Sequence, residues 1–429
     1  MNGIIIKHLR LEKGMKQIWL AQGICSTSYL SKIESNQVSP SEEIFSLLLK
    51  RLGVKFTPSF HKDEMIFEEE VYELYKEAIE QRNYKEINLK YQNLLENNKH
   101  LYFYENYLMY LVYFTRIELI LNQFKKDINI IDSLFNGATS RQIFLHKQNK
   151  ALYYYLNGNY NEAYILVESL FETLEFVYLK KWEEFDFYNI ASIILLKNKQ
   201  YIKALNYANS ALSYYQKNLI YDKIIDLYLV IGIANKNVGN YSVALSNYEL
   251  CQKLITDLND KKYQGTLYQN MGNLYSFQNL SKEALDYYSR SLSFKENIGF
   301  DESYFITLLS IIKEYSKTDE YYKVQKWAKK GLIELEESSL NNIRIKTYQY
   351  HFKIYYLKHK GDDLDIFDYI KQALDHFSNL NDFINVQKYS LLIAKLYKKQ
   401  FKYKEASYYY DFYIDSCLKI SKIKHWEDL

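Results

Sequence analysis

A pattern of small residues recurs about every 40 positions along this chain, and a helical repeat array accommodates such a period best. Its clearest copies place an alanine three residues after a tyrosine: Tyr160 and Ala163, Tyr201 and Ala204, Tyr241 and Ala244, and Tyr403 and Ala406. Weaker copies extend the series, at spacings of 36 to 42 residues, to Ile87, Asp127, Ala163, Ala204, Ala244, Ala284, Val324, Ile366 and Ala406. A second column lies twelve residues before the first, and six of its nine members are small: Tyr75, Thr115, Ala151, Ser192, Gly232, Gly272, Ile312, Ile354 and Ala394.

The scarcity of proline favours helices over strands. The two prolines, Pro40 and Pro58, both lie near the N-terminus, and the 371 residues that follow Pro58 contain none. Strands joined by tight turns need Gly and Pro at particular backbone angles, and the 429 residues include only 13 Gly. Each period therefore predicts a helix, a turn at Gly, Asn or Lys, and a second helix, with small residues where the two axes cross.

The repeating unit resembles the tetratricopeptide repeat. Its aromatic, apolar, Gly, Tyr and Ala positions recur in residues 268–275 (YQNMGNLY) and 284–288 (ALDYY). The resemblance covers about residues 66–420, with a period longer than the usual ~34 residues. Stacking about nine such hairpins buries a continuous core, and it is expected to form a right-handed superhelical array whose concave side is lined by the first helix of each pair.

Positive charge is concentrated at the N-terminus. Residues 1–56, which we call the head, hold eight Lys and Arg against four Glu, while the whole chain carries only +3. The remaining residues are therefore almost neutral. A basic head on a neutral body indicates that the head binds a polyanion. The alternative is a solvated surface on which positive charges are in excess by chance.

The head is expected to form four short helices. Gly14 can stop the first one in the left-handed conformation, and Gly23 follows the second. Ser39 is placed as the cap of the fourth, with Pro40 at its first helical position. The expected helices cover residues 3–13, 17–21, 27–34 and 41–52.

The third helix carries the most specific motif, Ser26-x-Ser-Tyr-Leu-Ser-Lys-Ile-Glu34, with Ser26 as its cap and Leu30 and Ile33 pointing inward. This motif resembles the lambda-repressor-type (XRE) helix-turn-helix family, although Lys16 replaces that family's usual Thr or Ser cap. The resemblance implies that the third helix enters the major groove of DNA. On that basis the residues facing base edges are Thr27, Ser28 and Lys32, and those contacting phosphates are Gln17, Asn36 and Gln37. A head that docks another protein is the alternative.

The fold class predicted from these patterns is all-α, a helix-turn-helix domain followed by about nine tetratricopeptide-like hairpins. We place the DNA-binding domain at residues 1–56, a linker at 57–65, and a repeat domain for peptide binding and oligomerisation at 66–429. This order resembles the Rap–NprR–PlcR–PrgX family of peptide-sensing quorum regulators, and the repeat number is most similar to NprR-like members. The resemblance implies a cytoplasmic transcription factor whose concave groove binds a short signalling peptide. Two-fold DNA sites make a homodimer the default, with a higher homo-oligomer as the alternative. A scaffold that sequesters a response regulator is the alternative.

A groove that holds an extended peptide needs side chains that pair with its backbone amides and carbonyls. The repeat register places such candidates on the inward face of the first helices, although each could equally be a solvated polar residue. They are Arg116, Gln148, Tyr155, Asn189, Lys236, Gln269, Asn273 and Lys313.

The sequence gives no indication of catalysis, a cofactor or a metal. Nucleotide-binding, zinc-protease and serine-hydrolase motifs are missing, and the closest histidine pair, His351 and His359, is spaced too widely for one metal. Three distant cysteines suggest neither a disulfide framework nor a zinc site, which fits a reducing cytosol. For Cys25 we favour apolar packing over a thiol switch. No apolar run is long enough to cross a membrane.

Overall fold

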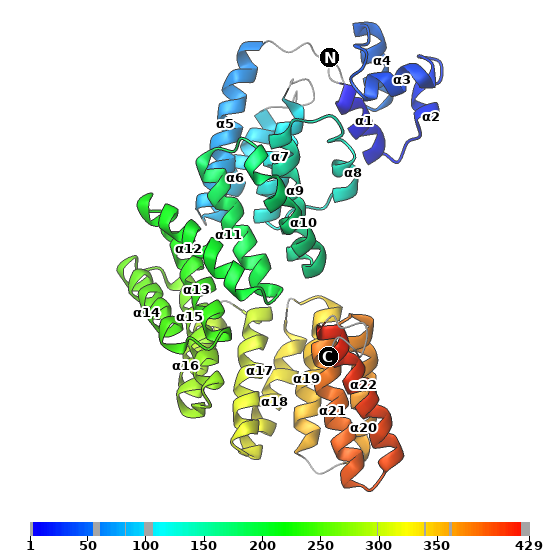
Figure 1. Cartoon of the computed structure of the whole chain (residues 1–429). Coiled ribbons are helices and arrows are strands. Elements are labelled where there is room, and N and C mark those ends of the chain that lie inside the picture. Colours follow the sequence, from blue (N-terminus) through cyan, green and yellow to red (C-terminus); the bar gives the residue numbers. More distant parts are fainter. Residues whose placement is uncertain are drawn as a thin grey trace. The chain divides into compact units, whose positions relative to one another are not determined.

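The computed structural model describes residues 3–54, 61–81, 83–97, 106–297, 299–338, 340–359 and 363–421, with only the backbone at 61–66, 97, 363 and 364. Within these residues every regular element is a helix (Figure 1), so the all-α prediction is confirmed. The chain divides into two compact units, Met1–Asn240 and Tyr241–Leu429, and each is described by itself. The predicted linker lies partly outside the described residues.

The first unit contains the head and the first repeats. The head helices are α1 (Gly3–Glu12), α2 (Gln17–Ala21), α3 (Thr27–Glu34) and α4 (Glu42–Arg51). The repeat helices are α5 (His61–Glu80), α6 (Tyr84–Asn97), α7 (Tyr107–Ile120), α8 (Ile128–Asp132), α9 (Ser140–Leu156), α10 (Tyr160–Thr173), α11 (Lys181–Lys197), α12 (Tyr201–Lys217) and α13 (Tyr221–Asn237).

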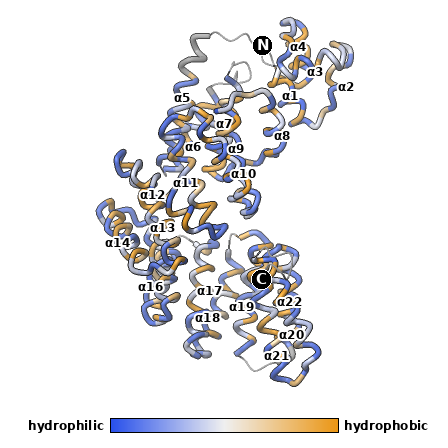
Figure 2. The backbone as a smooth tube through the Cα atoms, viewed as in Figure 1, coloured by the Kyte–Doolittle hydropathy of each residue, from blue (hydrophilic) through white to orange (hydrophobic). Residues whose placement is uncertain are grey.

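The second unit continues the same alternation of helices. Its members are α14 (Tyr241–Asp257), α15 (Gln264–Phe277), α16 (Ser281–Glu296), α17 (Glu302–Lys317), α18 (Tyr321–Glu336), α19 (Asn342–Lys358), α20 (Asp363–Asn379), α21 (Phe383–Lys399) and α22 (Tyr403–Ser421). Apolar and hydrophilic positions alternate along the helices of both units (Figure 2), because each helix turns one side to its neighbours and the other to solvent.

Tight turns with one left-handed residue join the two helices of most hairpins. Gly158 has φ +80°, and Lys199, Asn279 and Asp319 have φ values of 62°, 59° and 58°. The chain reverses there within a few residues, so consecutive helices pack as antiparallel neighbours. The expected turns at Gly, Asn and Lys are confirmed.

The two repeating columns lie where helices cross. Gly272 of α15 shows why the column twelve residues before the anchors is small. A Cβ atom at this position would lie 2.5 Å from Cδ1 of Tyr288 on α16. All nine residues of the earlier column and eight of the nine anchors are buried. The exception is Asp127, whose side chain accepts a hydrogen bond from the Asn129 amide and caps the five-residue helix α8. The expectation that Asp127 lies inside a full second helix was therefore wrong.

The head forms its four helices close to the predicted bounds. Gly14 ends α1 at φ +62°, and Ser26 caps α3 by accepting from the Tyr29 amide at 3.1 Å. The expected cap of α4 was wrong, because Ser41 and not Ser39 accepts from the Ile44 amide, at 3.3 Å. Pro40 therefore precedes α4 instead of starting it.

Helix α1 also connects the head to the repeats of the same unit. The Lys7 ammonium donates to the Ser133 carbonyl at 2.5 Å, just after α8, and His8 Nδ1 hydrogen-bonds the Tyr107 hydroxyl of α7 at 2.5 Å. Apolar residues of the head and of α5 to α12 belong to one continuous core. The head is thus packed onto the repeat helices as well as joined to them by the chain.

Candidate functional sites

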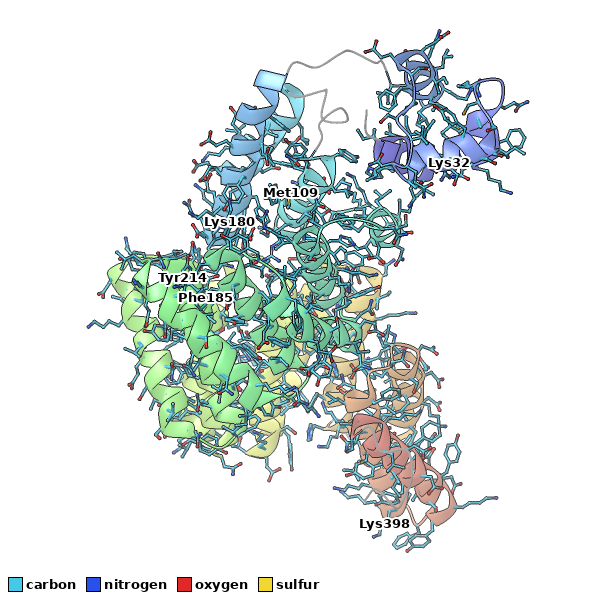
Figure 3. All side chains as sticks on the ribbon, turned by 45° about the horizontal axis from the view of Figure 1, so that its top comes forward. Lys32, Met109, Lys180, Phe185, Tyr214 and Lys398 are labelled. Atoms are coloured by element: carbon cyan, nitrogen blue, oxygen red, sulfur yellow. The ribbon has the colours of Figure 1, made fainter. Side chains whose placement is uncertain are left out.

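Helix α3 of the head presents a polar face to solvent. Thr27, Ser28 and Lys32 are exposed, whereas Leu30 and Ile33 are completely buried, as predicted. Lys32 lies on the exposed side of the head in Figure 3. Hydroxyl and ammonium groups on one side of a short helix are able to donate to base edges and phosphates. Sequence reasoning missed Ser31, which is exposed on the same helix.

A buried ion pair explains the glutamate that ends the motif. Arg10 of α1 donates from Nε and Nη2 to the two carboxylate oxygens of Glu34 at 2.6 and 2.8 Å, and from Nη1 to the Met15 carbonyl at 2.8 Å. Gln17 Nε2 donates to Glu34 Oε2 at 2.7 Å. Gln17 is thus half-buried, and one of its two amide N–H groups is committed to Glu34 inside the head.

The two loop candidates differ in their surroundings. Asn36 has φ +54°, and its side-chain oxygen accepts from the Gly3 amide at 2.7 Å, so it ties the loop after α3 to the start of α1. Gln37 is exposed. Of the two loop candidates, Gln37 is therefore the one whose exposed side chain does not tie the loop to α1.

Two large apolar side chains lie exposed beside α3. Ile18 and Trp19 of α2 are 62% and 63% exposed, and with Cys25 they line a hollow of about 470 Å³. Burial raises the pKa of the Cys25 thiol, which disfavours the thiolate that a redox switch needs. Its contacts with the core fit the packing role that we favoured.

In the first unit, two groove candidates share one counter-ion. Arg116 of α7 donates from Nη2 to both carboxylate oxygens of Asp186 on α11, at 3.0 and 2.9 Å. Gln148 of α9 donates to Asp186 Oδ2 at 2.7 Å. Three consecutive first helices therefore meet at one carboxylate. Asp186 was missed, although it lies three residues before Asn189 and hence on the same face of its helix.

Several polar atoms at this point lack a partner in the described structure. They are Nε and Nη1 of Arg116, Oε1 of Gln148 and Oδ1 of Asn189, and all are buried. Burying an unsatisfied donor or acceptor costs about 1–3 kcal/mol. The network therefore has unused hydrogen-bonding capacity for a further polar group.

The remaining candidates of the first unit lie apart from this network. Burial raises the pKa of Tyr155 to about 12, and its ring lies 5.6 Å from that of Tyr160. Lys236 of α13 is buried, and this lowers its pKa to about 8. Both side chains are partly desolvated.

In the second unit, the three candidates lie on α15 and α17. Gln269 donates to the Ser310 hydroxyl at 3.1 Å, and Asn273 accepts from the Tyr288 hydroxyl at 2.7 Å. Lys313 is exposed to solvent, yet its surroundings lower its pKa, first through desolvation and then through Lys317. Sequence reasoning missed the other lysines near Lys313, because they lie 45 to 86 residues farther along the chain, on other helices.

The described residues contain neither a helix that could span a membrane nor a group of three His, Cys, Asp or Glu side chains that could hold a metal ion.

Comparison with known proteins gives a consistent picture of both parts. A helix-turn-helix family model matches residues 6–58. The transcriptional activator NprA of Geobacillus stearothermophilus is 29% identical over 404 residues, which cover 91% of this chain and 97% of that protein. The resemblance to the Rap–NprR–PlcR–PrgX family is confirmed. The chain is thus similar to an NprR-like regulator over nearly its whole length.

Solved structures of this family share the fold. The apo quorum sensor NprR of B. thuringiensis superposes with a TM-score of 0.65 at 17% identity, covering 82% of this chain and 99% of that one. A Rap protein complexed with competence and sporulation factor gives a TM-score of 0.68 at 16% identity, covering 84% and 100%. NprR in complex with its cognate peptide NprX gives 0.59 at 18% identity, covering 81% and 98%. The predicted tetratricopeptide-like array is therefore confirmed.

Proposed function

We propose that this chain is a cytoplasmic transcriptional regulator that binds operator DNA through its head and is controlled by a short signalling peptide in the groove of its repeats. The observation that carries the proposal is the alignment of 91% of the chain with a transcriptional activator, together with the helix-turn-helix match over residues 6–58. A dimer is the default state, because two-fold DNA sites match two heads.

The geometry of the head supports its role in DNA binding. Thr27, Ser28 and Lys32 share the exposed side of α3, and the basic charge of the chain lies in the same domain. The buried pair of Arg10 and Glu34 fixes α3 against α1. A rigid helix with an exposed polar face is what base readout in the major groove requires.

The polar faces of the first helices support the peptide groove. Each unit offers its own set, with Arg116, Gln148 and Asn189 in the first and Gln269 and Asn273 in the second. Buried atoms without partners occur in both sets, including Oε1 of Gln269. The amides and carbonyls of a peptide are groups that such atoms bind.

Peptide binding to the purified protein tests the receptor role. Synthetic peptides tiled across the reading frame downstream of the gene would be titrated by calorimetry into the wild type, Asn189→Ala and Asn206→Ala. Asn206 is exposed on the second helix α12 and serves as the matched control. We expect one peptide to bind, with about 10-fold loss in Asn189→Ala and no loss in Asn206→Ala. Equal binding by both variants would remove Asn189 from the site, and no binding at all would contradict the receptor role.

Sequestration of a response regulator remains a weaker second candidate. The repeat fold is shared with Rap proteins, but this chain has an intact helix-turn-helix head. A protein partner alone does not require the exposed polar face of α3.

A further inference from the structure

Five lysines gather in the second unit, on the first helices of its last three hairpins. We call this group the lysine pocket, and it consists of Lys313 of α17, Lys358 of α19, and Lys388, Lys395 and Lys399 of α21. Four of the five line a cavity of about 400 Å³, and Lys313 acts electrostatically on Lys388 beside it. A volume of this size is within the range of small ligand sites.

The five lysines of the lysine pocket form no ion pair with a carboxylate among the residues that the structure describes. The Lys388 ammonium lies 4.8 Å from the ring centre of Tyr355 and 4.7 Å from that of Tyr389, and 3.4 Å from the Tyr389 hydroxyl. Aromatic faces and one hydroxyl thus take the place of a counter-ion.

The proximity of these lysines destabilises their charged forms. The pKa of Lys388 falls well below its usual value, first through desolvation and then through Lys313 and Lys358. Desolvation lowers the pKa of Lys358, as do Lys399 and Lys395, against an opposing effect of Asp319. A folded chain gains nothing in stability from such a group of like charges.

A helix-dipole effect does not account for the central lysine. Lys358 and Lys399 occupy the last turns of α19 and α21, where a cation interacts favourably with the helix dipole. Lys388 lies in the second turn of α21, toward the positive end of its helix. At this position the charge of Lys388 destabilises the folded chain, but it is well placed to bind an anion.

We propose that the lysine pocket binds a side-chain carboxylate of the signalling peptide, so that the peptide recognised by this protein carries an acidic residue there. The inference rests on the proposed function, because it assigns the chemistry of one end of the same groove. Lysine ammonium groups meet the carboxylate, and the partly exposed ring of Tyr355 contacts the apolar part of the same residue.

The proposal predicts proton uptake on binding. A carboxylate beside Lys388 favours the ammonium form, so the pKa of Lys388 rises on binding and the complex takes up a proton at pH values between its lowered and its raised pKa. Affinity therefore falls as the pH rises through this range. The charged and titratable groups in or around the lysine pocket, among the described residues, are Lys313 of α17, Asp319 after α17, His351, Tyr355 and Lys358 of α19, His376 of α20, and Tyr389, Lys395 and Lys399 of α21.

Two matched random heptapeptide libraries test the proposal with the full-length protein. One library has Asp or Glu fixed at a single position and the other has Asn or Gln, and bound peptides are identified by mass spectrometry and titrated individually. The variants are Lys388→Met, Lys358→Met and the control Lys398→Met, which removes an exposed lysine of the same helix that does not line the cavity (Figure 3). Thermal unfolding confirms that each variant is folded.

We expect acidic peptides to bind about 10-fold or more tightly than their amide counterparts, with most of that preference lost in Lys388→Met and Lys358→Met and kept in Lys398→Met. Calorimetry in buffers of different ionisation enthalpy should show proton uptake for acidic peptides only. Equal binding of acidic and amide peptides would overturn this inference and leave the proposed function intact. Binding of inorganic phosphate at the lysine pocket without an acidic-peptide preference would also overturn it. Absence of any bound peptide would contradict the proposed function and this inference together.

Discussion

At the residue scale, exposure separates side chains that hold the head together from those free to contact DNA. Leu30 and Ile33 could be assigned to the core from sequence, because their three-residue spacing places both on one side of α3. The inward hydrogen bond of Gln17 could not, because it depends on Glu34, which α1 and α3 bring close only in the folded head.

Lys32 and Gln17 should differ in their effect on DNA binding. Lys32→Ala should reduce the preference for operator over random DNA by about 10- to 100-fold, because a base contact is lost. Gln17→Ala should weaken binding to all sequences alike. Affinities at fixed salt on both DNAs check this, and a uniform loss from both substitutions would remove the assigned roles.

Asp186 should be important for stability as well as for the groove. Asp186→Asn leaves the buried Arg116 without its counter-ion, so we expect the free energy of unfolding to fall by about 3–5 kcal/mol. Asp286→Asn breaks an exposed pair with Arg290 and should cost less than about 1 kcal/mol. Urea unfolding compares the two, and equal losses would contradict the structural role of the buried pair.

At the element scale, the period of small residues predicted where the helix pairs lie, because only small side chains fit where two helices cross closely. The pattern could not show that α8 is only five residues long, since Asp127 fits the spacing but acts as a helix cap. It also could not distinguish Ser39 from Ser41 as the cap of α4, because both serines flank Pro40 and either spacing satisfies the rule. The groove candidates lie on the first helices of their hairpins, where the register placed them, and their role stays a prediction. The counter-ion Asp186 and the lysine pocket depend on contacts between neighbouring repeats, which the spacing within one repeat does not show.

The crossing of α15 and α16 should not tolerate a methyl group at its centre. Gly272→Ala forces the added Cβ against the Tyr288 ring, and we expect a net loss of about 1–3 kcal/mol despite the better helix propensity of alanine. Gly265→Ala on the same helix meets the flexible side chain of Lys295 at 3.2 Å and should change stability by less than about 1 kcal/mol. Thermal or urea unfolding measures both, and a neutral Gly272→Ala would show that the helices can separate at this point.

At the scale of the whole molecule, buried lysines and tyrosines make stability depend on alkaline pH in two opposite ways. The pKa of Lys295 is lowered to about 8 by burial, so between pH 8 and 10.5 the unfolded chain binds more protons and the free energy of unfolding rises with pH. Burial raises the pKa of Tyr113 and Tyr155 to about 12, so above pH 10 the folded chain holds more protons and stability falls.

Lys295→Met should therefore flatten the rise between pH 7.5 and 9.5. We expect the free energy of unfolding of the wild type to rise by at most about 3 kcal/mol over this range because of Lys295. The exposed control Lys282→Met should behave as the wild type. Urea unfolding at the two pH values measures the difference. Identical pH dependence in Lys295→Met and wild type would show that this lysine is not desolvated in the folded protein.

Peptide binding in the repeats is expected to change DNA binding by the head. Fluorescence anisotropy of the full-length protein on its own upstream DNA, at fixed salt, with and without peptides encoded just downstream, tests it directly. We predict that one peptide shifts the affinity or the stoichiometry, because a ligand that binds two DNA-binding states unequally changes their populations. Tight DNA binding that is the same with every peptide would contradict the claim and leave the repeats as a docking surface for another protein.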